Sequence, residues 1–261
     1  MSKVCQLFSG SSGNSIYISC SQAKILVDAG VTAKRIETAL GQIGEDASDI
    51  DAIFVTHEHT DHINGVRVLA CRYGIPVFAP QAVLDKMGEN GSINSKVSAF
   101  CVDNMELCGV EITPFALSHD SADCVGYKFV MPDKRKISVC TDTGLVTSQA
   151  HDTLLGSDLV FLESNHEITM VENGAYPYVL KQRILSSKGH LSNVACAEFA
   201  TELAQNGTTR FVLSHLSREN NHPMIAKQTT YSALVQSGFI ENRDFRLYVS
   251  SPENTERPII L

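Results

Sequence analysis

The chain has 261 residues, 43% of them hydrophobic, enough to bury a sizeable core in one domain spanning residues 1–261. It carries 21 Lys and Arg against 29 Asp and Glu, and the net charge of −8 argues against a protein that coats nucleic acid through general electrostatics. Eight scattered cysteines without a Cys-x-x-Cys pair disfavour a zinc finger and a disulfide framework. With no export signal and no apolar run of about 18 residues, we expect a cytoplasmic protein without a membrane span.

Short apolar runs between Gly and Ser turns open the chain and predict strands, and segments with helical spacing alternate with further strands. The predicted strands are Val4–Phe8, Ser15–Cys20, Lys24–Asp28, Ala52–Val55, Pro76–Ala79, Val97–Val102, Val110–Leu117, Val125–Val130, Lys136–Cys140, Leu159–Glu163, Phe211–Ser214 and Phe245–Val249. The predicted helices are Ala33–Ile43, Ile63–Tyr73, Val179–Leu185, Val194–Leu203 and Ile225–Val235. This order predicts an α/β fold of two sheets packed face to face with helices on both outer surfaces.

The most specific motif reads Thr-His-Glu-His-Thr-Asp-His and follows the predicted buried strand that ends at Val55. Residues two apart at a strand end point to the same side, so His57 and His59 can reach one metal ion while Asp61 and His62 face another. Imidazole and carboxylate groups suit Zn²⁺ and Mn²⁺ and are compatible with iron. The alternative, a solvated polar turn, does not account for three histidines at this spacing.

Further ligand-type residues follow other predicted strands. His119, Asp142 and His215 each stand just after a strand, where active-site groups of layered α/β folds gather. Asp28 ends the strand Lys24–Asp28 and is a candidate for orienting a ligand histidine, with a plain turn aspartate as the alternative.

In order and approximate spacing, Asp28, the run from His57 to His62, His119, Asp142 and His215 resemble the five motifs of the metallo-β-lactamase superfamily. The resemblance implies a four-layer αββα sandwich and two divalent cations. It implies that one cation is held by His57, His59 and His119, that the other is held by Asp61, His62 and His215, and that Asp142 bridges the two. A hydroxide shared by two cations about 3.5–4 Å apart is chemistry suited to a phosphodiester.

Three further segments, Phe8–Ser15, Lys188–Asn193 and Leu213–Asn221, resemble the YycJ (WalJ) family. That bacterial branch is regarded as 5′-exonuclease-like, so the resemblance implies a nuclease with DNA rather than RNA as its partner. The stretch between Asp142 and His215 is too short for the inserted β-CASP domain of the ribonuclease J type. A single metallo-β-lactamase domain is therefore expected.

Glu163 ends a predicted strand and His190 precedes a helix, as the Glu and His motifs do in the similar tRNase Z-like enzymes. The resemblance implies that Glu163 accepts a hydrogen bond from His190 and orients it as a general acid, with Asp61 as a further catalytic residue. A solvent-exposed histidine at the start of a helix is the alternative for His190. No role is assigned to His151, His166 or His222.

Segments that flank the predicted site supply candidate substrate contacts, for which ordinary solvated surface is the alternative. These candidates are Arg183, Lys188, Ser192, Asn193, Arg218 and Asn220. The loop Gly10–Gly13 is either an anion-binding nest or a plain hairpin turn.

Two other functions stay open. The same site could hydrolyse a small thioester, lactone, lactam or cyclic phosphodiester. A non-hydrolytic protein, such as a two-iron redox carrier or a regulatory binding module, is the third class. Metal identity and oligomeric state are not encoded in the spacing of the motifs.

Overall fold

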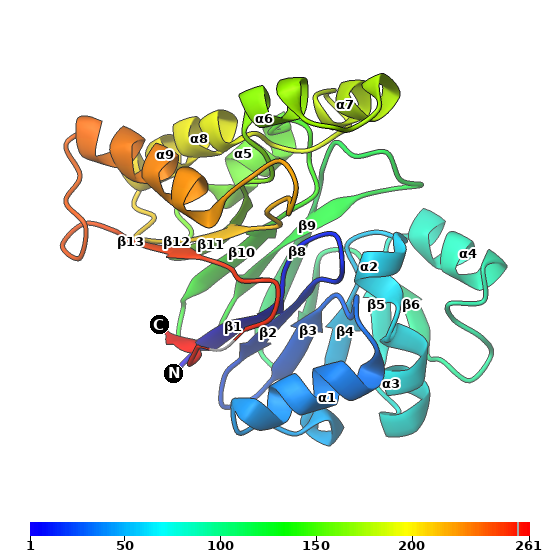
Figure 1. Cartoon of the computed structure of the whole chain (residues 1–261). Coiled ribbons are helices and arrows are strands. Elements are labelled where there is room, and N and C mark those ends of the chain that lie inside the picture. Colours follow the sequence, from blue (N-terminus) through cyan, green and yellow to red (C-terminus); the bar gives the residue numbers. More distant parts are fainter. Residues whose placement is uncertain (255) are drawn as a thin grey trace.

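The computed structural model describes residues 1–254 and 256–261, which form two seven-stranded sheets with helices outside them (Figure 1). The first sheet has the strand order β14-β1-β2-β3-β4-β5-β6 and the second has the order β13-β12-β11-β10-β9-β8-β7. The first sheet contains β1 (Lys3–Phe8), β2 (Ser15–Ser19), β3 (Lys24–Val27), β4 (Ala52–Phe54), β5 (Val77–Ala79), β6 (Ala99–Cys101) and β14 (Ile259–Ile260). The second contains β7 (Met105–Leu107), β8 (Val110–Ala116), β9 (Val125–Val130), β10 (Lys136–Cys140), β11 (Leu159–Glu163), β12 (Arg210–Ser214) and β13 (Arg246–Val249).

The two halves of the chain repeat one plan. In the first sheet β1, β2 and β3 pair antiparallel, and β3 to β6 continue in parallel. In the second sheet β7 to β10 pair antiparallel, and β10 to β13 continue in parallel. Parallel neighbours need crossover connections, and helices supply most of them.

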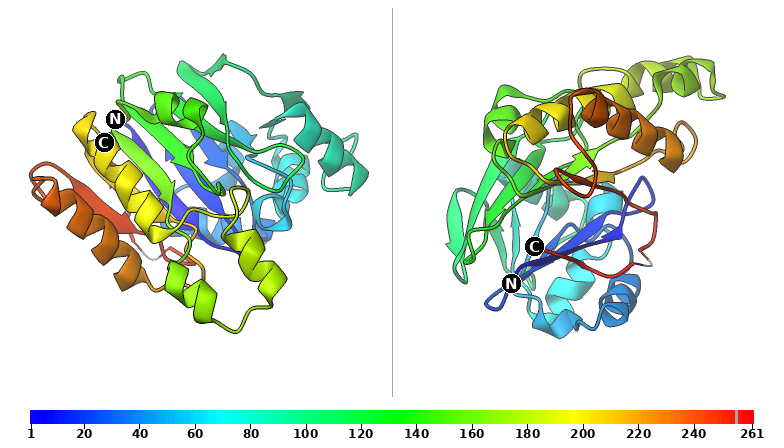
Figure 2. Two further views of the ribbon diagram at one scale, coloured as in Figure 1. Left: turned by 90° about the horizontal axis from the view of Figure 1, so that it is seen from above. Right: turned by 90° about the vertical axis from the view of Figure 1, so that its left-hand side faces the viewer.

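Helices cover the outer face of each sheet, as the views in Figures 1 and 2 show. The first half has α1 (Ala33–Gln42), the 3-10 turn Ala47–Asp49, α2 (Thr60–Ile63), α3 (Val66–Tyr73) and α4 (Gln81–Glu89). The second half has α5 (Ser148–Leu154), α6 (Ile168–Asn173), α7 (Tyr178–Ile184), α8 (Asn193–Gln205) and α9 (Pro223–Gln236). No helix in the described ranges is long and apolar enough to cross a membrane.

Alternating side chains of the strands build three apolar layers. On β3, Ile25 and Val27 face the other sheet, whereas Leu26 packs under the helices of the first half. On β11, Phe161 joins the layer between the sheets and Leu162 the layer beneath α8. Strands covered on both faces read as continuous apolar runs, which is why they are visible in the sequence.

The four-layer α/β architecture predicted from the order of elements is confirmed, and all twelve predicted strands are present with ends shifted by at most two residues. One prediction was wrong: the helix Ile63–Tyr73 is divided into α2 and α3. The backbone N–H of Gly65 donates to the carbonyl oxygen of Ala29 at 2.7 Å instead of to a residue of the same helix, and a Cβ there would lie 2.4 Å from the carbonyl oxygen of Val31. The strand predicted to end at Asp28 ends at Val27, because Asp28 has a left-handed φ of 61°.

Candidate metal centre

Five side chains of the centre stand within three residues of the carboxyl ends of strands. Asp28 follows β3, His57 follows β4, His119 follows β8, Asp142 follows β10 and His215 follows β12. Asp28, Asp142 and His215 have φ angles of 61°, 64° and 57°. Left-handed backbone is uncommon outside glycine and clusters at functional sites, so the surrounding structure must hold these three turns in place.

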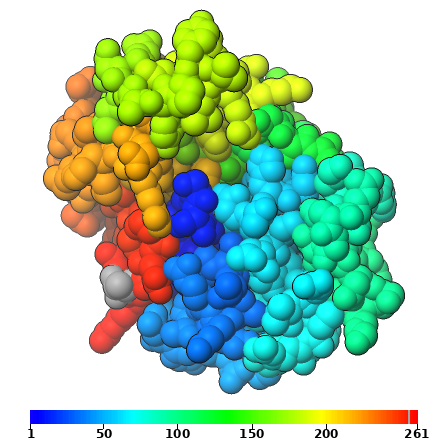
Figure 3. All heavy atoms as spheres, turned by 45° about the vertical axis from the view of Figure 1, so that its right-hand side comes forward, coloured from blue at the N-terminus to red at the C-terminus, as the bar shows by residue number. Residues whose placement is uncertain are grey.

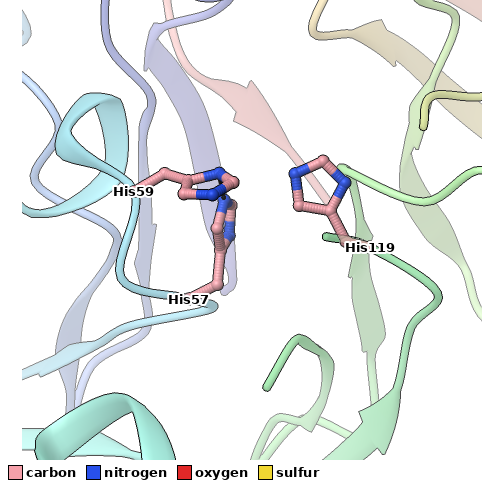
Figure 4. A group of neighbouring side chains, drawn as sticks. All are labelled: His57, His59 and His119. Atoms are coloured by element: carbon pink, nitrogen blue, oxygen red, sulfur yellow. Dashed lines mark hydrogen bonds between the residues drawn. The ribbon is translucent and has the colours of Figure 1, made fainter. Parts of the chain in front are cut away.

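His57, His59 and His119 form the first ligand group (Figure 4). Nε2 of His57 lies 3.1 Å from Nδ1 of His59, and the His119 ring centroid is 5.1 Å from the centroids of both other rings. Nδ1 of His119 donates to the carbonyl oxygen of Gly189 at 3.1 Å, which leaves Nε2 of His119 as its metal-binding atom. The three imidazoles together can hold one cation.

Asp61, His62 and His215 form the second ligand group. Oδ2 of Asp61 lies 3.6 Å from Nε2 of His62 and 3.9 Å from Nε2 of His215. Asp142 joins the two groups: its Oδ2 is 3.5 Å from Nε2 of His62, and it forms a further ligand group with His57 and His62. The structure thus brings all seven predicted metal ligands together.

Asp28 lies behind this group and is itself almost fully buried. Its Oδ2 accepts a hydrogen bond from Nδ1 of His62 at 2.8 Å, so Nε2 of His62 faces the centre. The backbone N–H and the hydroxyl of Thr56 also donate to this carboxylate, at 2.8 and 2.9 Å. The Thr56 hydroxyl also lies 3.0 Å from Nδ1 of His57. It can therefore orient His57 directly and His62 through Asp28.

Glu163 is a fully buried carboxylate with four donors around it. Its Oε1 accepts from Nδ1 of His190 at 2.8 Å and from Nδ1 of His215 at 2.9 Å. Its Oε2 accepts from the backbone N–H groups of Thr143 and Leu191, at 2.8 and 3.2 Å. Glu163 therefore fixes the ring of a metal-ligand candidate and the ring of the predicted acid at the same time.

Charge and burial shift the pKa values of the histidines in opposite directions. Burial lowers the pKa of His62, but the surrounding carboxylates, Asp142 first among them, outweigh it and raise the pKa to about 9. Burial opposes the same carboxylate effect at His215, whose pKa is nevertheless raised well above its ordinary value. Burial and the neighbouring imidazoles hold the pKa of His57 well below its ordinary value. The carboxylates therefore stabilise positive charge around His62 and His215, whereas burial favours the neutral imidazole of His57.

Two buried atoms of the centre make no hydrogen bond within the described residues: Oδ2 of Asp142 and Nε2 of His215. A buried carboxylate oxygen without a donor is costly unless a cation or another donor reaches it. Imidazole nitrogens and carboxylate oxygens are also the donor set of protein-bound Zn²⁺ and Mn²⁺. The residues present fit divalent cations.

A family model described as the Beta-lactamase superfamily domain matches residues 23–216, which is most of the chain and contains every candidate ligand. The protein belongs to the metallo-β-lactamase superfamily. It is 39% identical over 253 residues to exodeoxyribonuclease WalJ of Streptococcus pneumoniae serotype 2, covering 95% of this chain and 93% of that protein. It is 34% identical over 250 residues to exodeoxyribonuclease YycJ of Bacillus anthracis, covering 95% and 94%. Within the superfamily it therefore belongs to the WalJ/YycJ family, as the sequence motifs predict.

Solved structures agree on the fold. The metallo-beta-lactamase fold protein YhfI of Bacillus subtilis superposes with a TM-score of 0.73 at 14% identity, over 97% of this chain and 98% of that one. Zn²⁺-bound PqqB of Methylobacterium extorquens also gives 0.73, at 16% identity over 100% of both chains. The predicted metallo-β-lactamase sandwich is confirmed.

The WalJ/YycJ motif Phe8–Ser15 contributes two contacts that sequence reasoning missed. Nδ2 of Asn14 lies 3.0 Å from Nε2 of His62, and the hydroxyl of Ser9 accepts the backbone N–H of His215 at 2.8 Å. The motif itself is the signal in the sequence, since it carries the family resemblance without any ligand-type histidine. It packs the β1–β2 loop against the second ligand group.

Gly30 was also missed, and the reason for a glycine there is steric. A Cβ at this position would lie 1.6 Å from the carbonyl oxygen of Asp61 and 2.6 Å from the backbone nitrogen of Asn14. The backbone N–H of Gly30 donates to the carbonyl oxygen of Asn14 at 2.8 Å. Only glycine lets three segments of the centre approach this closely.

Three of the candidate substrate contacts are basic and lie at the surface. Arg183 on α7 pairs with Asp120, Arg218 donates to the hydroxyl of Ser12 at 2.7 Å, and Lys188 is exposed. The arginines can therefore reach the segments that surround the centre, and Lys188 faces solvent.

The other three candidates make contacts within the protein. Ser192 caps α8 by accepting the backbone N–H of Ala195, and Asn193 is fully buried and bonded to Asn221 at 3.0 Å. Asn220 is 2% exposed, and its Nδ2 makes no hydrogen bond within the described residues. Ser192 and Asn193 therefore both make structural contacts within the protein.

The three histidines without an assigned role belong to none of the ligand groups found among the described residues. His222 caps α9 by accepting the backbone N–H of Met224, and His166 is buried. His151 pairs with Asp152 and Glu202 on the outer helices of the second half.

Proposed function

We propose that this protein is a single-domain, cytoplasmic, metal-dependent exodeoxyribonuclease that removes nucleotides from the 5′ end of DNA. The observation that carries the proposal is the position of Asp142, which joins two ligand groups beside the Glu163–His190 pair. Its relatives over 95% of the chain are named exodeoxyribonucleases, whereas ribonuclease Z of Clostridioides difficile matches at 28% identity over 44% of it. These matches favour DNA over RNA.

In this proposal two divalent cations, Zn²⁺ or Mn²⁺, occupy the centre. One would be held by His57, His59 and His119, the other by Asp61, His62 and His215, and Asp142 would contribute its carboxylate to the centre. Such a pair would lower the pKa of water and neutralise charge on the phosphate that is attacked. A β-CASP domain is not part of the proposal, because β11, α5 to α8 and β12 fill the chain between Asp142 and His215.

The chain's own groups handle the protons. Nδ1 of His190 is bonded to Glu163, so Nε2 of His190 is free to give a proton to the leaving oxygen. Asp61, with a side chain 26% exposed, is the carboxylate of the ligand set that solvent reaches best, and in this proposal it takes the proton of the attacking water. A water oxygen bonds to phosphorus, the bond from phosphorus to O3′ breaks, and O3′ takes the proton from His190. The products are a 3′-hydroxyl and a 5′-phosphate.

The DNA strand would approach through the basic side chains around the centre. Arg183, Lys188 and Arg218 are exposed or half-buried and lie in segments next to His190 and His215. Phosphate contacts of this kind give affinity that falls as salt rises.

The test uses 5′-phosphorylated, 3′-labelled single-stranded DNA with protein stripped of metal and reconstituted separately with Zn²⁺ and Mn²⁺. The His57→Ala variant, purified in the same way, controls for contaminating nucleases. Labelled strands that shorten stepwise from the 5′ end, only with added metal and only with the unaltered chain, are the expected result.

Absence of cleavage with either metal, in protein shown to bind the metals, would overturn the nuclease. Small thioesters, lactones, lactams and cyclic phosphodiesters would then be tested on the same reconstituted samples.

A further inference from the structure

A pocket of about 170 Å³ opens beside the metal centre, with His190 and His215 in its lining. Apart from Gly189 and the ion pair of Asp120 with Arg183, the rest of its wall has two chemical faces. One face is apolar and aromatic, and it is formed by Tyr176, Leu180 and Ile184. The other face is polar and carries no formal charge, and it is formed by Ser11, Asn165 and Ser217.

The apolar face belongs to α7 and the residues just before it. None of the residues Tyr178–Ile184 is buried, and Figures 1 and 2 show α6 and α7 at the edge of the molecule. In Figure 3 the dark-blue N-terminal segment lies at the surface directly beneath this yellow-green region. Packing within the described residues does not explain an exposed helix that carries apolar and aromatic side chains.

Charge around the pocket fits an anionic chain. Lys181 and Arg183 lie on α7 and Lys188 follows it, while Asp120 offsets Arg183 through their ion pair. A phosphate that approached Arg183 would compete with Asp120 for the guanidinium. The pocket wall thus holds one charged pair, Asp120 and Arg183, and two further basic residues, Lys181 and Lys188, lie on or just after the same helix.

The direction of bond breaking places the pocket on one side of the scissile phosphate. If His190 gives its proton to O3′, the nucleotide that carries this O3′ is the terminal one and lies on the His190 side. The pocket lies on the same side, because His190 is part of its lining. A base on this side would meet the ring of Tyr176, and base–aromatic stacking tolerates every base because each has a π-face.

We propose that this pocket holds the terminal nucleoside of the DNA strand, with its base against Tyr176, Leu180 and Ile184 and its sugar toward Ser11 and Ser217. The inference rests on the proposed exonuclease function. Its volume is below the about 300 Å³ at which pockets for drug-sized ligands begin, which suits one nucleoside. Binding of one nucleoside in this pocket makes the enzyme cut behind the first nucleotide, and Tyr176 sets that register.

The test compares Tyr176→Ala with Tyr178→Ala. Tyr178 is the matched control, because it lies two residues away, is 75% exposed and does not line the pocket. Binding of thymidine 5′-monophosphate, the type of product released, is measured by calorimetry on the metal-loaded protein. Loss of the stack should weaken binding about tenfold in Tyr176→Ala and leave it within about twofold in Tyr178→Ala.

Deoxyribose 5-phosphate, which has no base, is the second ligand. It should bind the unaltered chain and Tyr176→Ala equally, because the lost contact is with the base. Tyr176→Leu retains apolar volume without the ring and should give a smaller loss than Tyr176→Ala. Equal effects of the Tyr176 and Tyr178 substitutions, or equal losses with and without the base, would overturn the pocket assignment.

The outcomes separate this inference from the proposed function. If Tyr176→Ala cleaves DNA as fast as the unaltered chain and binds the mononucleotide equally well, the nuclease function is supported and the pocket assignment is wrong. If the mononucleotide binds in a manner that depends on Tyr176 but DNA is not cleaved, the pocket is a nucleotide site and the proposed exonuclease function is wrong.

Discussion

Nδ1 of His215 donates to the same oxygen, Oε1 of Glu163, that accepts Nδ1 of His190, at 2.9 and 2.8 Å. One buried carboxylate thus sets the tautomer of a candidate metal ligand and of the candidate acid. In each ring Nε2 is left free, in His215 for a cation and in His190 for the substrate. In the proposed mechanism, Glu163 would therefore couple metal binding to proton transfer.

Replacing this carboxylate should therefore impair both. All four neighbours of this carboxylate donate hydrogen bonds to it. The amide NH₂ of Glu163→Gln is also a donor, so it would face another donor in either orientation of the amide. We expect metal affinity to fall about 10- to 100-fold, as for other groups that orient ligand histidines, with turnover falling as well. Competition with a fluorescent chelator measures the affinity, and Glu198→Gln on the exposed face of α8 is the control. Unchanged affinity in Glu163→Gln would show that Glu163 does not orient a ligand.

Much of this site was predictable because Asp28, His57 and His215 follow strands that are buried on both faces. Ile25, Phe54 and Phe161 are buried between the sheets, and such strands are visible as runs that end abruptly at a polar residue. The position of a ligand at a strand end then follows from chain order alone.

What the sequence did not predict depends on contacts between distant segments or on weak local patterns. Asn14 reaches His62 only because the β1–β2 loop packs on α2, a contact across 48 positions. Helices α4, α5 and α6 were not predicted, and the short α6 buries only Val171, so it shows no apolar periodicity. The break at Gly65 coincides with its hydrogen bond to the carbonyl oxygen of Ala29, a contact between distant segments that helix propensity does not report.

Asp142 and His190 should separate metal binding from proton transfer. Asp142→Ala removes the carboxylate common to both ligand groups, and we expect loss of bound metal and of turnover together. His190→Ala should retain the metal and lower turnover about 10²- to 10⁴-fold, the usual range for a general acid. Metal content by atomic emission and DNA hydrolysis are measured on the same samples. Normal turnover in Asp142→Ala would contradict the dinuclear centre.

Gly30 should not tolerate even one methyl group. The Cβ of Gly30→Ala would collide with the Asp61 carbonyl oxygen, which is backbone and cannot move aside alone. We expect a loss of about 3 kcal/mol in the free energy of unfolding, at the upper end for overpacking, with weaker metal binding. Gly41→Ala is the matched control: it lies in α1 with nothing within 4 Å of its Cβ and should stabilise by about 0.5 kcal/mol. Urea unfolding measures both, and equal stability of the two variants would contradict the close approach at Gly30.

His151 should give the protein a small pH-dependent stability that does not involve the metal centre. Hydrogen bonds to Glu202 and Asp152 raise the pKa of His151 above its ordinary value of 6.5. A raised folded-state pKa means that the gain is complete below pH 6.5 and is lost as pH rises through the folded-state value. The imidazole is partly exposed, so the gain is about 0.3–1 kcal/mol. His151→Gln should therefore be destabilised relative to the unaltered chain at pH 5.5 by more than at pH 9, measured by urea unfolding at both values. A difference that is equal at both pH values, or larger at pH 9, would show that the charged pairs contribute nothing.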